Sequence, residues 1–270
     1  YALGRYNQGE STLAHPLLKK LQKGDLLIAD RHFAAGHFYW YYKSLGIEFL
    51  TKAHQKLKIS RIKRIESYSQ NDFLGWLQIN EKYRQADPFL PDKIMVRFIK
   101  ILIRQRGRCK TVWFATSLLD NRLYPAEEIA MLYGRRWRIE TLFKEVKVNL
   151  SADVLRSLSP CGIRKEVAAR LIAVNIVRTI MLEAAVESNV DPLRISFVHA
   201  IRAIVMVSPA LAIEPLWKLP QIYRAMLVEI GTHLVPERPG RKEPRAVTRE
   251  RKHYTRLRST REQWRTAYAA

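Results

Sequence analysis

The sequence predicts an α/β protein, and three observations carry the prediction. A short apolar run at residues 26–29 is followed by a helix-like segment at 34–45 and by a second apolar run at 47–51. Runs rich in β-forming residues then occupy much of 76–116, and an amphipathic segment begins at Pro125. Short, continuous apolar runs are typical of strands buried on both faces. The order strand, helix, strand therefore predicts a right-handed parallel crossover.

Residues 53–118 are predicted to form a β-rich insertion. Its first part is a basic block of Lys56, Lys58, Arg61, Lys63 and Arg64. Three β-rich runs follow at residues 76–79, 94–104 and 111–116, and Gly107 predicts a hairpin turn between the last two. The basic block fits a solvated surface and a nucleic-acid contact equally well.

Helices are predicted for most of residues 125–230. Pro125 at the first turn, with Glu127 and Glu128 against the positive end of the dipole, marks a helix that runs to about Lys147. Its apolar side, which we expect to be buried, consists of Leu132, Ile139, Phe143 and Val146. Trp137 is also expected to pack. Further helices are predicted at residues 160–187, 192–206 and 220–230. We thus divide the chain into a core segment (1–52), the insertion (53–118), a helical region (119–232) and a basic tail (233–270).

Composition restricts the class of partner. The chain has 270 residues, 47% of them hydrophobic, which is enough for a core and excludes overall disorder. Its 47 Lys and Arg against 25 Asp and Glu give a net charge of +22. The usual partner of such an excess is nucleic acid. An anionic membrane is the competing partner, but it would require a basic amphipathic helix or a lipidation signal, and neither stands out.

The two cysteines indicate the cellular compartment. Cys109 and Cys161 belong to no Cys-x-x-Cys motif or Cys/His cluster, which argues against a disulfide framework and against structural zinc. A reducing cytoplasm fits this usage. The apolar run at residues 167–186 contains charged residues, so we expect a buried helix there and no membrane span. Because the chain starts at Tyr1 and not at Met, we expect it to be part of a longer protein.

Four residues of the helix after Pro125 carry the candidate chemistry. At about 100° per residue, Tyr133, Arg136, Glu140 and Lys147 fall within roughly 60° of one another. A carboxylate flanked by cations suits a metal held beside a phosphate backbone, whereas the plain alternative is a solvated charged face. Asp30 follows the strand at 26–29, at the strand end where ligands gather in α/β sheets. Asp30 and Glu140 together offer oxygen ligands for Mg²⁺, although Asp30 also fits a turn or cap.

The spacing Tyr-x2-Arg-x3-Glu-x6-Lys, met by Tyr133, Arg136, Glu140 and Lys147, resembles the signature of DDE transposases of the insertion-sequence-four group. Residues 24–33 resemble the strand that carries the second aspartate of that family, and residues 9–14 are similar to the segment that leads into it. The Arg- and Pro-rich residues 238–245 are similar to the end of such proteins.

The resemblance implies a ribonuclease-H-like core, incomplete at its N-terminus and interrupted by a β insertion. It implies cleavage of phosphodiesters at transposon ends with Mg²⁺ (or Mn²⁺) and strand transfer into target DNA. Asp30 would be the second metal-binding acid and Glu140 the third, while Tyr133, Arg136 and Lys147 would contact phosphates. The partners would be double-stranded DNA and a second copy of the protein in a homodimer on DNA, in the bacterial cytoplasm at the nucleoid.

The same resemblance implies that the first catalytic aspartate lies on an earlier strand. Asp25 starts the strand that ends before Asp30 and cannot replace it, so we expect a fragment that lacks the first acid. Missing strands would leave open sheet edges, and we expect the isolated chain to be poorly soluble. The alternative functions are a non-catalytic DNA-binding transposase remnant and, with less support, an RNA-processing factor that shares the fold.

Three aromatic and histidine residues are lesser candidates. In related transposases an insertion tryptophan can receive an unstacked base, and Trp113 fits that role, although a core aromatic is the plainer interpretation. His32 and His37 flank Phe33 near the strand end, where a loop or helix-face role is favoured over metal binding.

Overall fold

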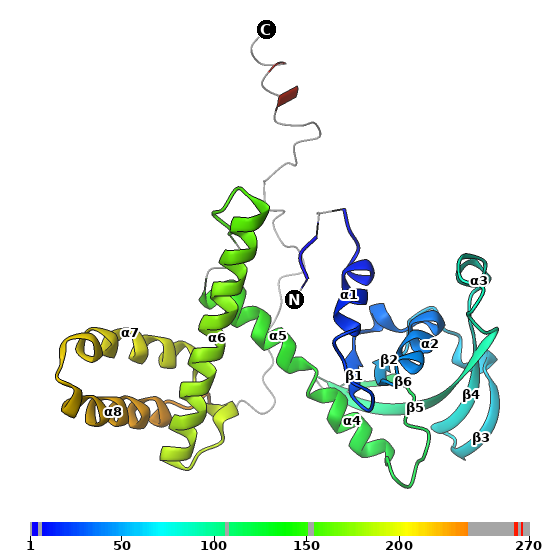
Figure 1. Cartoon of the computed structure of the whole chain (residues 1–270). Coiled ribbons are helices and arrows are strands. Elements are labelled where there is room, and N and C mark those ends of the chain that lie inside the picture. Colours follow the sequence, from blue (N-terminus) through cyan, green and yellow to red (C-terminus); the bar gives the residue numbers. More distant parts are fainter. Residues whose placement is uncertain are drawn as a thin grey trace. The chain divides into compact units, whose positions relative to one another are not determined.

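A six-stranded mixed sheet, in the order β1-β2-β6-β5-β4-β3, occupies the N-terminal half of the chain (Figure 1). Its strands are β1 (Leu26–Ala29), β2 (Glu48–Lys52), β3 (Lys63–Ser69), β4 (Asp72–Gln78), β5 (Lys93–Gln105) and β6 (Arg108–Thr116). The computed structural model describes residues 2–4, 7–105, 108–150, 154–236, 262, 263 and 266, and for 103–105 and 108–110 it describes the backbone alone. Tyr1–Pro236 forms one unit and Glu237–Ala270 a second.

The predicted crossover is present as β1, α2 (Gly36–Ser44) and β2. The two strands pair in parallel, from Leu26 opposite Glu48 to Ala29 opposite Thr51. The sequence prediction of a parallel strand–helix–strand unit is therefore confirmed. Together with the helices below, it makes the protein a mixed α/β protein, whereas the finer assignment to a ribonuclease-H-like core stays a prediction.

The strands of residues 53–118 continue this sheet. β6 pairs antiparallel with β2, with Leu50 opposite Thr116, and also with β5 along its whole length. The β5–β6 pairing reaches Gln105 and Arg108, which confirms the predicted hairpin, although the turn residue Gly107 lies outside the described residues. The division of the chain into core and insertion stays a prediction.

Helices cover both faces of the sheet. On one face, α1 (Glu10–Leu18) and α2 bury Leu18, Phe38 and Tyr42 with Phe49 and Phe98 of the strands. On the other face, Ile129 of α4 (Ala126–Gly134) packs against Leu50, Ile99 and Phe114. Leu50 and Ile99 directly follow Phe49 and Phe98 in their strands. This alternation follows from the period of two along a strand. A short helix that the sequence did not predict, α3 (Glu81–Ala86), is capped by the side chain of Asn80.

The C-terminal helices are α6 (Pro160–Ser188), α7 (Phe197–Ile213) and α8 (Leu219–Thr232). Ser159 caps the start of α6, and Asn189 ends it in the left-handed conformation, with φ of 52°. All three helices were predicted, but α7 begins later than expected because Pro192–Arg194 forms a separate turn, η4. They share a core that includes Met181, Ala200 and Ile230. No helix among the described residues is both long and apolar enough to cross a membrane.

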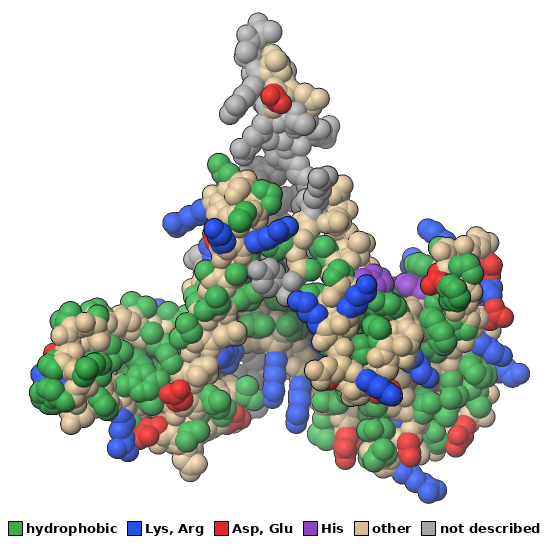
Figure 2. All heavy atoms as spheres, viewed as in Figure 1, with side chains coloured by type: hydrophobic (Ala, Val, Ile, Leu, Met, Phe, Trp, Pro, Cys, Tyr) green, Lys and Arg blue, Asp and Glu red, His purple; other side chains and the backbone are tan. Residues whose placement is uncertain are grey.

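Two features bear on the expected low solubility. Within the described part of the chain, β1 pairs with β2 alone, so its other edge has no partner strand. Large apolar side chains of the helical region are also exposed, and Figure 2 shows many of them; they include Val186, Met206, Ile213 and Trp217. Such surfaces favour association. The predicted basic tail lies almost entirely outside the described residues, and low solubility stays a prediction.

Candidate active site

Asp30 lies directly after β1, at the carboxyl end of a parallel strand. It caps the turn η1 (Arg31–Phe33), because its Oδ1 accepts a hydrogen bond from the main-chain N–H of Arg31. The side chain nevertheless remains 52% exposed. The two sequence interpretations, a cap and a ligand, are therefore compatible at this position, since capping uses one oxygen and leaves the carboxylate accessible.

The helix predicted for residues 125–147 is divided in the structure, so the prediction of one continuous helix is wrong. α4 ends at Gly134, α5 (Trp137–Lys144) follows, and a π-helical turn, η3 (Glu145–Asn149), completes the run. At the break, the N–H groups of Arg135 and Arg136 bond to carbonyls three residues earlier, as in a 3₁₀-helix. The helix is tighter than an α-helix at the break and wider in η3. Both changes alter the rotation of about 100° per residue that places Tyr133, Arg136, Glu140 and Lys147 on one side.

Arg136 and Glu140 form the centre of the candidate site. Nη2 of Arg136 donates to Oε1 of Glu140 at 2.8 Å. The Arg136 side chain is 18% exposed and that of Glu140 is 38% exposed. Tyr133, one turn earlier, has its ring 5.8 Å from the Arg136 guanidinium and packs on Phe114 of β6. The contact with Phe114 packs Tyr133 against the sheet.

Electrostatic effects connect Asp30 to this group. Burial raises the pKa of Tyr133 above its ordinary value, and the negative charge of Asp30 raises it further, although Arg136 opposes the shift. Burial alone would lower the pKa of Arg136. The hydrogen bond to Glu140 and the charge of Asp30 outweigh it, so that the pKa is raised and the cation is permanent. The charge of Asp30 thus acts on the same guanidinium that bonds to Glu140.

Comparison with known proteins identifies the family of this chain. Residues 1–176 match the protein family described as "Transposase DDE domain". The chain belongs to this family. It is also 24% identical over 257 residues to "Transposase InsG for insertion sequence element IS4" of Escherichia coli (strain K12). That match covers 91% of this chain and 55% of the relative, so the chain spans about half of the relative's length. The predicted resemblance to transposases of the insertion-sequence-four group is confirmed.

Two predicted site residues of this transposase DDE domain make other contacts among the described residues. Lys147 lies in η3, where its ammonium is 5.6 Å from the ring centre of Phe143, and it makes no ion pair with Glu140 within the described part of the chain. Trp113 of β6 is partly buried and packs with the core on the α2 face of the sheet, whereas its neighbour Phe114 faces Tyr133. Trp113 and Tyr133 therefore lie on opposite faces.

The apolar side predicted for the glutamate helix is also partly wrong. Leu132 and Val146 pack against buried clusters, as expected. Ile139 and Phe143 are 41% and 52% exposed, and Trp137 is 59% exposed. The helix is interrupted at residues 135–136, and the four residues do not form one continuous buried stripe. In the transposase DDE domain this leaves aromatic side chains exposed beside the charged group.

Sequence reasoning missed two charged residues near the site. Arg31 follows Asp30 and contributes to the electrostatic environment of Tyr133. Glu145, only 4% exposed, begins η3 and accepts a hydrogen bond from Arg178 of α6. That pair fixes the end of the glutamate helix to α6. No local pattern in the sequence marks Glu145 as buried, because its partner Arg178 lies 33 positions later.

The histidines near Asp30 have other contacts. Nε2 of His32 lies 3.1 Å from Oγ of Ser11 in α1. The ring of His37 stacks on Tyr83 of α3, with 3.8 Å between ring centres. Both residues therefore connect helices around the α2 face.

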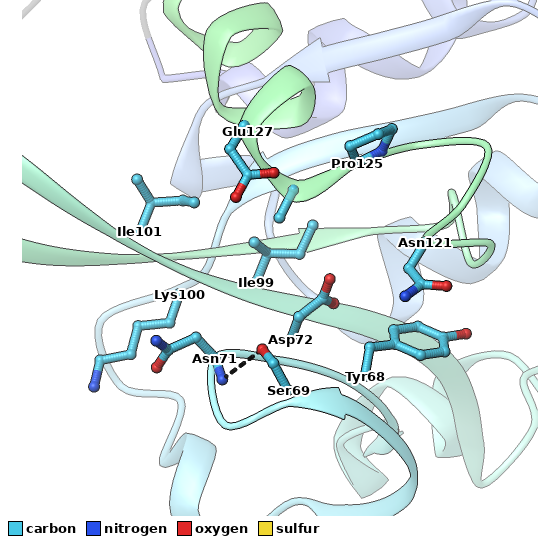
Figure 3. Close-up of a pocket in the computed structure, with 11 residues that line it drawn as sticks. Tyr68, Ser69, Asn71, Asp72, Ile99, Lys100, Ile101, Asn121, Pro125 and Glu127 are labelled. Carbon is cyan, nitrogen blue, oxygen red and sulfur yellow. Dashed lines mark hydrogen bonds between the residues drawn. The ribbon is translucent and has the colours of Figure 1, made fainter.

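A polar cavity of about 360 Å³ lies at the start of α4 (Figure 3). Asn71, Lys100, Asn121 and Glu127 line it together with Asp72. The Asp72 carboxylate is fully engaged by Arg97, whose Nε lies 2.8 Å from Oδ1. This pocket therefore offers Glu127 as its one unengaged carboxylate among the described lining residues. It is a weaker candidate for metal chemistry than the group around Arg136.

Proposed function

We propose that the protein containing this chain carries out DNA transposition, by metal-dependent cleavage of phosphodiesters at transposon ends and strand transfer into target DNA. The observation that carries the proposal is the hydrogen bond from Arg136 to Glu140, with the charge of Asp30 acting on the same guanidinium. Family membership supports the reaction class. Two protomers assembled on paired DNA ends would supply the sites for both strands.

Asp30 and Glu140 fit a divalent cation with oxygen ligands, because both offer carboxylate oxygens that remain partly exposed. When bound there, Mg²⁺ or Mn²⁺ would activate the attacking water or hydroxyl and stabilise the leaving oxygen. The permanent charge of Arg136 lowers the repulsion between the two carboxylates. A third acid is implied by the family resemblance. Asp25 does not supply it, since it precedes the opposite end of β1 and accepts from the Gln22 main-chain N–H.

Arg136, Tyr133 and Lys147 are the proposed phosphate contacts. Arg136 is held against the Glu140 carboxylate, and its fork of N–H groups suits phosphate oxygens. Tyr133 has a raised pKa, so its hydroxyl keeps its proton and can donate. Lys147, farther along the helix, would contact the backbone at another phosphate. Core packing is the favoured role of Trp113, and receipt of an unstacked base is the alternative.

The test of catalysis is Glu140→Gln in a full-length version of the protein. We expect strand cleavage to be lost while DNA binding is retained, because the variant removes a metal ligand and keeps the cationic surface. Glu128→Gln, an exposed acid in the first turn of α4, is the matched control and should cleave normally. Cleavage by the Glu140→Gln protein would disprove the assigned role.

The test of phosphate contact is the salt dependence of DNA binding by this chain. Arg136→Gln and Lys147→Gln should each reduce the slope of log K against log[salt] by about 1. Lys82→Gln on α3, an exposed lysine, is the control and should leave the slope unchanged. Salt-sensitive binding without cleavage in the full-length protein would instead support the alternative, a DNA-binding remnant. Equal or tighter binding of RNA would favour an RNA-processing role.

A further inference from the structure

Three metal-ligating side chains meet where α7 starts and α8 ends. His199 lies in the first turn of α7, Glu229 in the last turn of α8, and His233 directly after α8. One ligand atom from each of the three lies within 4.8 Å of the other two. This group differs in its ligands from the proposed transposition site. It offers two imidazoles and one carboxylate, whereas Asp30 and Glu140 offer carboxylates alone.

The distances within the group match a small tetrahedral ion. Nε2 of His199 is 3.3 Å from Oε1 of Glu229, and Nδ1 of His233 is 3.6 Å from the same oxygen. Zinc bound to nitrogen and oxygen at about 2.0–2.1 Å in a tetrahedron separates neighbouring ligand atoms by about 3.3 Å. The two separations are close to that edge.

The Nε2 atom of His199 is the second observation that points to a ligand. It is buried, and none of the described residues forms a hydrogen bond with it, although the Glu229 oxygen is at ion-pair distance. A buried polar atom without a hydrogen bond is uncommon and calls for a partner. A metal ion between the imidazole and the carboxylate would supply that partner.

The backbone around the group is fixed before any ion binds. The N–H of Ser196, the residue that caps α7, donates to the carbonyl of His233 at 2.9 Å. Ile195 and Leu234 form an antiparallel bridge beside it. These bonds hold the start of α7 against the end of α8, helices that lie side by side in Figure 1. Little backbone order would therefore have to be created on binding.

One of the two rings must turn before both can bind one ion. They are stacked with 3.4 Å between centres and 10° between planes, whereas a metal lies in the plane of each imidazole that it binds. Nδ1 of His233 is also 3.0 Å from Thr232 Oγ1 and 3.2 Å from the Glu229 carbonyl. His233 is half exposed, and rotation about the last torsion of a histidine meets a broad, shallow energy profile. Turning this one ring opens the stack.

We propose that His199, Glu229 and His233 form a structural Zn²⁺ site that fastens the start of α7 to the end of α8. Two imidazoles and one carboxylate favour zinc over Mg²⁺, which prefers oxygen ligands. Water would complete the tetrahedron. From the sequence, the absence of a cysteine cluster argued against structural zinc. The proposed ligand set contains no cysteine. Its members His199 and Glu229 are 30 residues apart in the chain.

The test is calorimetric titration of the full chain, without a histidine tag, with ZnCl₂ after removal of metals by a chelator. All variants are made in a background protein that carries Asp30→Asn and Glu140→Gln. These two substitutions remove the acids of the proposed transposition site. It should still bind one Zn²⁺ per chain, and excess Mg²⁺ should not displace it. His199→Gln, Glu229→Gln and His233→Gln should each weaken binding at least about tenfold. His54→Gln, an exposed histidine outside the group, should bind as the background does.

Two further measurements keep the proposal open to disproof. Zn²⁺ should raise the Tm of the background protein and leave that of His233→Gln unchanged, while far-UV circular dichroism checks that each variant is folded. Glu229 and His233 are at least half exposed, so their variants should fold even where His199→Gln does not. Undiminished Zn²⁺ binding by the double variant Glu229→Gln/His233→Gln, or no Zn²⁺ binding by the background protein, would overturn the proposal.

Discussion

Arg97 and Asp72 form a buried ion pair between neighbouring strands, with Nε of Arg97 2.8 Å from Oδ1 of Asp72. The Arg97 side chain is fully buried. Its Nη1 also donates to the carbonyls of Leu118, Asp120 and Tyr124, at 2.7–3.3 Å. These carbonyls belong to the loop that enters α4. One guanidinium thus ties the sheet to the start of the region that carries Tyr133 and Glu140.

Replacing Arg97 with Met should destabilise the protein strongly. The substitution leaves the Asp72 charge buried without a partner and removes three hydrogen bonds to the loop, at a cost of about 3–5 kcal/mol in the free energy of unfolding. Urea unfolding measures this change. Arg84→Met is the control: Arg84 pairs with Glu81 and Asp92 near the surface, so its loss should cost about 1 kcal/mol or less. Equal effects of the two variants would contradict the argument.

Replacing Gly134 with Ala should stabilise the protein by about 0.4–1 kcal/mol, because alanine loses less backbone entropy on folding. Gly134 ends α4, its φ is not positive, and a Cβ there would meet no atom within 4 Å. Gly36→Ala is the control. Its Cβ would lie 2.9 Å from Cγ1 of Ile79, so that variant should be destabilised in the same urea measurement. A loss of stability in Gly134→Ala would show that the break between α4 and α5 requires glycine.

The sequence predicted those parts of the fold that depend on local pattern. The β1–α2–β2 unit and the three C-terminal helices follow from apolar periodicity and from residues that start or end helices. The contact of Arg136 with Glu140 follows from their spacing of four on a helix. Asp30 was placed correctly at a strand end, because a short apolar run followed by a charged residue marks that boundary.

The parts that could not be predicted depend on contacts between distant residues. Glu145 is buried because Arg178, 33 positions later, pairs with it, and no periodicity encodes that pairing. Ile139 and Phe143 are exposed, and whether a helix face is covered depends on packing partners that periodicity does not name. The meeting of His199 with Glu229 similarly requires the antiparallel placement of α7 and α8, which the sequence alone does not specify.

Stability should depend on pH through His37. Burial lowers the pKa of His37 in the folded protein, and repulsion from His15 adds to the effect. The unfolded chain therefore binds more protons than the folded one below about pH 6.5, so stability is complete above that pH and falls as the pH decreases. His37→Gln should flatten the profile of urea midpoint against pH in this range. His54→Gln should keep the profile of the unmodified protein, and a profile unchanged by His37→Gln would refute the assignment.

Trp113 should act mainly through packing. Its ring meets Phe73 edge to face at 5.9 Å and lies 5.9 Å from the Lys100 ammonium, on the sheet face opposite Tyr133. Trp113→Ala should lower the free energy of unfolding by about 3 kcal/mol, as for a truncated core aromatic. Trp113→Leu keeps an apolar side chain but removes the aromatic face, so it separates packing from stacking.

DNA with unpaired bases is the probe that distinguishes these roles. If Trp113 packs in the core, Trp113→Leu should bind this DNA within a factor of two of the unmodified chain at the same salt concentration. If Trp113 receives a base, the lost stacking of about 1–3 kcal/mol should weaken binding at least about fivefold. Fully paired DNA of the same length is the control, because its bases cannot stack on the protein. A loss confined to the unpaired DNA would restore the base-receiving role and require Trp113 to become accessible on the α2 face of the sheet.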